Sequence, residues 1–187
     1  MSSTLKSYKL ITDYITGKEV PNIGAEENRQ ALERFLVEEK GYFKEDIEVD
    51  VDIAITVAGD VYRSQIDLAV SPGVGKTRLM VVKCAAGSLG SCEREIVAAA
   101  RLLDDYPIPF AVVSDGQSAI ILDTVSGKKV GEGLNALPSR ETAIRKLQTF
   151  NRTAFPKERL EREKLIFRTY DCANINVQRN VCPLISD

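Results

Sequence analysis

The period of the hydrophobic positions changes from helical to alternating about a quarter of the way along the chain. Residues 25–40 place apolar side chains three and four positions apart, which predicts an amphipathic helix that ends near Gly41. Residues 48–57 instead alternate apolar and polar side chains, as expected of a strand with one buried face. The apolar members of this strand are Val49, Val51, Ile53, Ile55 and Val57.

Short apolar segments separated by turn residues predict the rest of a sheet and one helix within it. Gly59 and Asp60 make a tight reversal into a second strand, and Ser91 is a candidate N-cap for a helix that follows the third strand. Asp115 and Gly116 form a typical hairpin pair. The predicted strands are 61–70, 78–85, 110–114 and 119–123, and the helix spans about 91–105.

Further helices are predicted outside this core, at about 4–15, at 140–150 with Ser139 as its cap, and at 156–170 with Pro156 in its first position. The fold class is therefore α/β, a mixed sheet flanked by helices in αβββαβ order, with extra N- and C-terminal helices. We expect one domain over residues 1–187, with a core of about 25–139, an N-terminal helix within 1–20 and a helical extension over 140–187.

The amino-acid composition excludes several kinds of catalytic and metal site. The chain has no histidine, which excludes histidine triads and histidine-bound metals. Its four cysteines lack the close pairing of structural zinc sites, and with no secretory signal or membrane-length apolar run we expect reduced thiols and a cytoplasmic protein. These cysteines are Cys84, Cys92, Cys172 and Cys182. Net charge is −2, but from Pro138 onward ten Lys/Arg face six Asp/Glu, which permits a local basic face.

The segment 71–77, SPGVGKT, looks like a phosphate-binding loop at first sight. The full pattern needs glycine where Val70 stands, and the loop leads into a strand and not into a helix whose amides could bind phosphate. We therefore expect an exposed hairpin loop and no nucleotide.

Two charged residues lie inside apolar strands. Asp67 is surrounded by Ile66, Leu68, Ala69 and Val70, and Lys83 lies within the segment 80–85, MVVKCA. A buried charge is costly unless another group pairs with it, so both indicate a site. The alternatives are an Asp67 on the solvent face of its strand and a Lys83 that reaches solvent at the end of its strand.

With these residues, the stretch of about 25–139 resembles the N-terminal PD-(D/E)XK nuclease domain of type I restriction enzyme R subunits. The pieces that carry the resemblance are AEENRQ at 25–30, GY at 41–42, QIDLAV at 65–70, LMVVK at 79–83 and PFAVVSDG at 109–116. The resemblance implies a restriction-endonuclease-like fold, DNA as partner and Mg²⁺ or Mn²⁺ as cofactor. It also implies association with a second copy or with restriction-complex subunits.

The resemblance also implies roles for particular residues. Asp67 would bind the metal, Lys83 would be catalytic, and a helical glutamate, Glu26 or Glu27, would assist. Arg29 and Gln30 would contact DNA.

One position departs from the family pattern. The acid two residues before the lysine is replaced by Val81, which cannot bind a metal. Either the acid has moved to the next helix, as Glu93 or Glu95, or the site is inactive and the domain is a module for binding DNA or protein.

Overall fold

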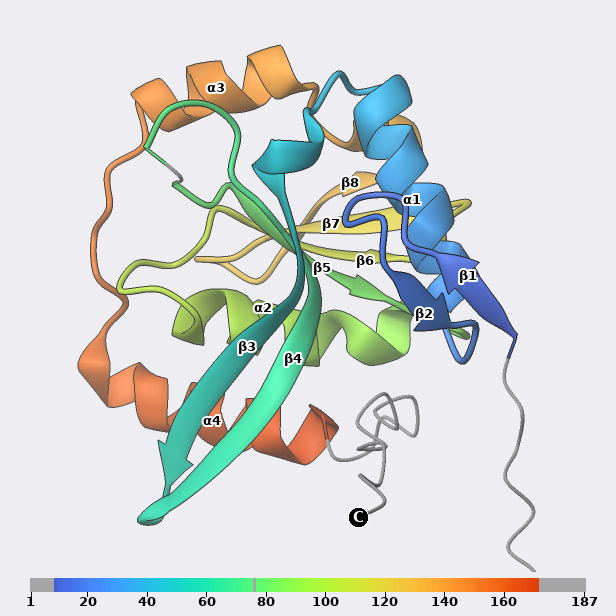
Figure 1. The fold of residues 1–187 in the computed structure, drawn as a ribbon. Coiled ribbons are helices and arrows are strands. Elements are labelled where there is room, and N and C mark those ends of the chain that lie inside the picture. The colour runs from blue at the N-terminus through green and yellow to red at the C-terminus, as the bar shows by residue number, and fades with distance from the viewer. Residues whose placement is uncertain (1–8, 76, 172–187) are drawn as a thin grey trace, which may run out of the picture.

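A six-stranded sheet forms the centre of the protein, whose computed structural model describes residues 9–75 and 77–171 (Figure 1). The strand order is β3-β4-β5-β6-β7-β8, and all neighbours are antiparallel except β5 and β6. Helix α2 makes the crossover between these two parallel strands, as parallel neighbours require. The strands are β3 (Ile47–Val57), β4 (Asp60–Val70), β5 (Met80–Cys84), β6 (Phe110–Ser114), β7 (Ala119–Asp123) and β8 (Lys129–Glu132).

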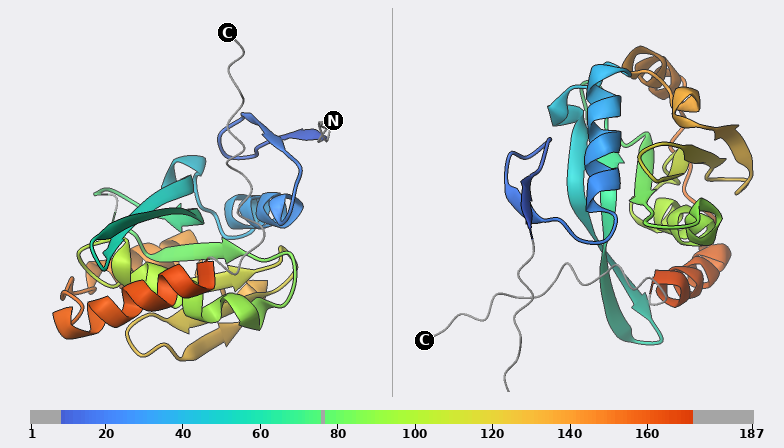
Figure 2. Two further views of the ribbon diagram at one scale, coloured as in Figure 1. Left: turned by 90° about the horizontal axis from the view of Figure 1, so that it is seen from below. Right: turned by 90° about the vertical axis from the view of Figure 1, so that its right-hand side faces the viewer.

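Helices cover both faces of this sheet and bury a separate apolar core on each (Figures 1 and 2). On one face, side chains of α1 and α3 pack with Val82 and Val112; on the other, side chains of α2 and α4 pack with Val81 and Val113. Since successive residues of a strand point to opposite faces, β5 and β6 are buried on both sides. The helices are α1 (Glu26–Glu38), α2 (Glu93–Leu102), α3 (Arg140–Gln148) and α4 (Lys157–Asp171).

Most predicted elements are confirmed to within a few residues. In β3 the alternating apolar positions Val51, Ile53, Ile55 and Val57 are buried, and the residues between them are exposed. In α3 the Ser139 hydroxyl caps the helix by accepting from the Thr142 amide, as predicted. The start of α2 differs: residues Leu89–Cys92 form a 3₁₀ turn first, in which the Ser91 hydroxyl donates to the Ser88 carbonyl.

The predicted N-terminal helix is wrong wherever the structure describes it; residues 1–8 lie outside that part. Strands β1 (Leu10–Thr12) and β2 (Glu19–Pro21) form a hairpin instead. The Asp13 carboxylate accepts from the Thr16 amide at 2.6 Å and binds Arg29 of α1 at 2.7 Å. The contact of Asp13 with Arg29, sixteen residues further along the chain, thus stabilises this turn and overrides the helical propensity of the segment.

Three smaller features complete the comparison with the sequence. The edge strand β8 was not predicted, because its four residues are mostly exposed and lack an apolar alternation. The loop after β4 is exposed at Val74 and Gly75, whereas Ser71 and Pro72 are buried. Of the four cysteines, Cys84 and Cys92 are buried free thiols; Cys172 and Cys182 lie outside the described residues.

Two hairpin glycines have positive φ but different surroundings. This difference predicts that replacing them with alanine will cost unequal amounts of stability. A Cβ on Gly116 would lie 2.8 Å from the Asn28 carbonyl oxygen of α1, whereas one on Gly59 would meet nothing within 4 Å. Gly59→Ala should cost about 1 kcal/mol of unfolding free energy from backbone strain alone. Gly116→Ala should cost about 1–3 kcal/mol more, because the β6–β7 turn must move off α1.

Urea denaturation of both variants measures this difference. Equal losses would show that the turn does not rest closely on α1.

Candidate active site

The structure places Asp67 and Lys83 on adjacent antiparallel strands. The register pairs Leu68 with Val82, and its continuation sets Asp67 opposite Lys83 on the face that α2 covers. Asp67 is 8% exposed and accepts a 2.7 Å hydrogen bond from the Cys84 amide. This bond from the neighbouring strand explains how a carboxylate is tolerated within an apolar segment.

Helix α2 adds a second carboxylate to these two groups. Glu95, in the first turn of α2, lies with its carboxylate 3.0 Å from the Lys83 ammonium, and both side chains are more than nine-tenths buried. Val81, where the family's acid would stand, is fully buried in the apolar core beneath α2. The structure therefore brings Glu95, and not residue 81, to the lysine.

A third carboxylate, which the sequence analysis did not identify, comes from the end of α4. Asp171 is 2% exposed and accepts a hydrogen bond from the Tyr62 hydroxyl of β4. Its negative charge also helps to raise the pKa of both Lys83 and Glu95. In the sequence, Asp171 stands just past the predicted end of this helix at about residue 170, and no motif singles it out.

Burial and the nearby carboxylates together shift the pKa values of Lys83 and Glu95. Burial by itself would lower the pKa of Lys83, but the nearby carboxylates Asp67, Glu95 and Asp171 outweigh it and leave the pKa raised. Burial raises the pKa of Glu95, and Lys83 only partly opposes that effect. Lys83 is therefore a firmly protonated cation, and not a base, at neutral pH.

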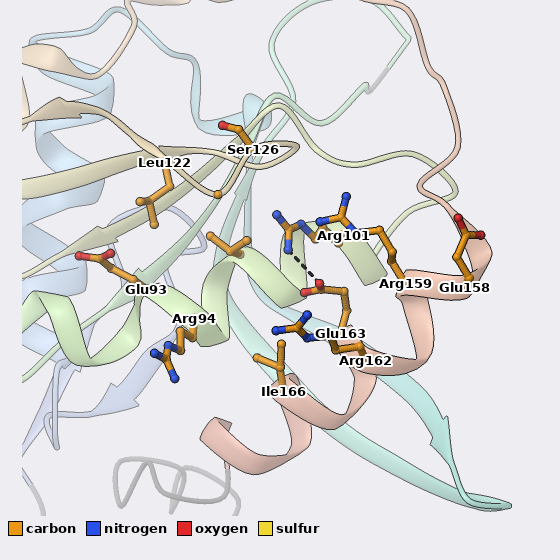
Figure 3. A pocket seen from close by; sticks show the side chains of 12 residues that line it. Glu93, Arg94, Arg101, Leu122, Ser126, Glu158, Arg159, Arg162, Glu163 and Ile166 are labelled. Atoms are coloured by element: carbon orange, nitrogen blue, oxygen red, sulfur yellow. Dashed lines mark hydrogen bonds and ion pairs between the residues drawn. The ribbon is translucent and has the colours of Figure 1, made fainter.

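Glu93 points elsewhere, although it lies only two residues from Glu95. It lines a separate pocket of about 620 Å³ between α2, the β7–β8 turn and α4 (Figure 3). In this pocket arginines alternate with glutamates, and the buried Arg101 donates to Glu163 at 2.9 Å. Residues two apart on a helix point about 200° apart, so α2 can present only one of its first-turn acids to Lys83.

The predicted residues of α1 lie on the opposite face of the sheet. Arg29 is 1% exposed and forms ion pairs with Asp13, Glu26 and Glu33 at 2.5–2.7 Å. Gln30 is also buried, and its amide nitrogen donates to Asp13 and Glu26. This arrangement does not support the expected DNA contacts of Arg29 and Gln30, because their polar groups are buried among carboxylates.

The two candidate helical glutamates differ in their surroundings. Glu26 is buried beside Arg29, which its carboxylate binds through two nitrogens. Glu27 is exposed and accepts a 2.6 Å hydrogen bond from the Asn22 side chain. The contacts of Glu26 and Glu27 thus connect α1 with itself and with the segment before it.

The cluster around Lys83 has the donor type and charge that suit a hard divalent ion, namely carboxylate oxygens in excess over one cation. In the described part of the chain, however, no group of three His, Cys, Asp or Glu side chains is arranged so that it could hold a metal ion as it stands. Ion binding would therefore require these carboxylates to move.

The mixed sheet and its flanking helices define an α/β protein, and this architecture is consistent with a nuclease-like fold. A family model described as the type I restriction enzyme R protein N terminus matches residues 24–138, and the chain belongs to this family. Comparisons with curated proteins and with solved structures gave no match. Within the described residues, no helix is long and apolar enough to cross a membrane.

The carboxylate cluster around Arg29 predicts a pH-dependent stability. Burial raises the pKa of Glu33 from 4.5 to about 7. Between these values the folded state binds more protons than the unfolded state, so the unfolding free energy should fall as pH rises from about 4.5 to about 7. Glu33→Gln should reduce this slope, while Glu39→Gln, on the exposed surface next to the end of α1, should leave it unchanged.

Urea denaturation across this pH range is the measurement. Because the pKa of Glu95 is also raised, a smaller slope should persist in Glu33→Gln. A slope identical to wild type would show that Glu33 titrates normally in the folded protein.

Proposed function

We propose that this domain hydrolyses DNA phosphodiesters with Mg²⁺ or Mn²⁺, as part of a type I restriction complex, and that Asp67, Lys83 and Glu95 carry the reaction. The observation that supports this most directly is the buried pair between Lys83 and Glu95, 3.0 Å apart, beside Asp67. In this proposal Glu95, from the helix after the lysine strand, supplies the carboxylate that Val81 cannot provide.

Each side chain has a definite part in this proposal. Asp67 and Glu95 would hold the ion, which when bound neutralises the scissile phosphate and acidifies a water. Lys83, as a fixed ammonium, would orient that water or stabilise negative charge that develops on the phosphate. The Cys84 amide holds Asp67 in position through its 2.7 Å hydrogen bond.

Membership of the family supports DNA and the other restriction subunits as partners. The exposed arginines of α2 and α4, among them Arg94, Arg159 and Arg162, line the pocket beside the site and provide cationic groups on the same side of the sheet. Cations on a surface attract the phosphate backbone irrespective of base sequence. Their glutamate neighbours limit the net charge of this surface, so we assign it no sequence specificity.

A second candidate is a catalytically inactive module that binds DNA or protein. It is favoured by the burial of the site: Asp67, Lys83 and Glu95 are each no more than 8% exposed, and Glu95 already binds the lysine. A phosphate could reach these groups only after local opening.

Conservative substitutions separate the two candidates. Asp67→Asn and Glu95→Gln should each lower the rate of Mg²⁺- or Mn²⁺-dependent DNA cleavage by about 100-fold or more, because each removes a charged group from the reacting centre. Glu93→Gln is the matched control on the same helix turn, and it should cleave like wild type.

Cleavage is measured on plasmid DNA, with melting temperatures to confirm folding. If wild type binds DNA but does not cleave it with either ion, the domain is a binding module. Cleavage that persists in Asp67→Asn would refute the assignment of the site.

A further inference from the structure

We propose that Asp50 of β3 is a positioning residue for the candidate site. Its left-handed backbone conformation turns the β3–β4 hairpin and so holds Asp67 in the place from which it faces Lys83. That Asp67 belongs to a catalytic site rests on the function proposed above. The effect of Asp50 on the placement of Asp67 is measured without metal or DNA, so the two proposals can fail separately.

Asp50 has a backbone conformation that is unusual inside a strand. Its φ is +53°, in the left-handed region, whereas antiparallel strands have φ near about −140°. A residue other than glycine adopts this conformation at a cost of about 1–2 kcal/mol. Strained residues of this kind cluster at functional sites, where the surrounding structure holds them in place.

One other non-glycine residue has positive φ in the part of the chain that the structure describes, namely Ala58 at +52°. It lies in the turn between β3 and β4, where a tight hairpin requires this conformation. Asp50 lies in the middle of β3, where no turn requires it. The same hairpin therefore offers two residues with matching φ but different surroundings.

The strand register sets Asp50 opposite Asp67. The pairs on either side of it are Val49 with Leu68 and Val51 with Ile66. One residue of each strand lies between these pairs, so no residue is inserted as in a β-bulge. The left-handed residue thus stands directly across from the carboxylate that is proposed to hold the metal ion.

Both strands of the hairpin change faces at this level. Residues two apart in a strand normally point to the same face of the sheet. Val49 packs in the core on the side of α1 and α3, but Val51 packs in the core on the side of α2 and α4. On β4, Leu68 and Ile66 differ in the same way. This rotation carries the far half of the hairpin to α4, which β3 contacts (Figure 1).

Pairing between β4 and β5 ends at the same level. The last pair is Leu68 with Val82. One residue further from this pair, the Asp67 carboxylate accepts from the Cys84 amide at 2.7 Å. If the two strands stayed side by side, a backbone carbonyl of β4 would accept from that amide instead. The turn of the hairpin at Asp50 thus frees this donor for the Asp67 carboxylate.

Substitutions that differ in their tolerance of positive φ test the proposal. Valine is strongly disfavoured in the left-handed region, so Asp50→Val should displace the strand at this point. Asp50→Gly adopts the conformation freely and should keep the wild-type arrangement, although it removes the carboxylate. Ala58→Val is the matched control, because it strains the same hairpin at nearly the same φ but in the turn, away from Asp67.

The measurement is amide hydrogen exchange by NMR on the full chain. The Cys84 amide reports on Asp67, and the Leu79 amide, which donates to the Val70 carbonyl before the same strand, serves as the reference. In Asp50→Val the Cys84 amide should exchange about tenfold faster relative to this reference than in wild type, and its chemical shift should move. In Asp50→Gly and Ala58→Val the ratio should stay within about twofold of wild type.

The control variants decide how a change is interpreted. An equal response of the Cys84 amide in Asp50→Val and Ala58→Val would attribute the effect to general strain in the hairpin and overturn the proposal. An equal response in Asp50→Val and Asp50→Gly would attribute it to the lost carboxylate and also overturn it. If Asp50→Val does not fold, Asp50→Ala carries the same expectation with a smaller change.

DNA cleavage by the same proteins separates this inference from the proposed function. If the Cys84 amide responds as expected and wild type cleaves no DNA with Mg²⁺ or Mn²⁺, the positioning role stands and the nuclease proposal fails. If wild type cleaves DNA and Asp50→Val matches it in both cleavage rate and Cys84 exchange, the positioning role alone is overturned.

Discussion

The α2–α4 side of this protein is organised around one buried ammonium. Lys83 is buried near the end of the apolar strand β5, where an unpaired charge would cost several kcal/mol. Three elements supply the compensating charge: β4 through Asp67, α2 through Glu95 and α4 through Asp171. Because each carboxylate comes from a different element, the neutralisation of Lys83 also sets how strand, crossover helix and C-terminal helix sit against one another.

On the opposite face of the sheet a buried cation is again surrounded by carboxylates, but here the cation is an arginine. There the guanidinium of Arg29 connects the β1–β2 hairpin to α1 through Asp13, Glu26 and Glu33. Arginine suits this role since its planar donors can serve several carboxylates at once and it stays charged. The family resemblance implied DNA contacts for this arginine, which in the structure is buried among acids and joins the hairpin to α1.

The proposed site uses Glu95 in place of an acid at residue 81, and the path of the chain after β5 makes this possible. A short connection and a 3₁₀ turn bring the first turn of α2 back over the end of the strand. Glu95 thereby reaches Lys83 from the α2 side of the sheet, while Val81 packs in the apolar core. The same geometry buries Asp67, Lys83 and Glu95, so the proposed function requires α2 or α4 to move before a phosphate can reach them.

Local patterns in the sequence were enough to predict strands β3 to β7, helices α1 to α4 and a candidate site at Asp67 and Lys83, because periodicity and apolar context are local properties. Contacts between distant segments fixed the remaining features. The N-terminal hairpin depends on the distant Arg29. The choice of Glu95 over Glu93 depends on which side of α2 faces the sheet, since both acids share one helix turn. Asp171 reaches Tyr62 of β4 only because α4 packs against α2, and no local pattern in the sequence predicts that contact.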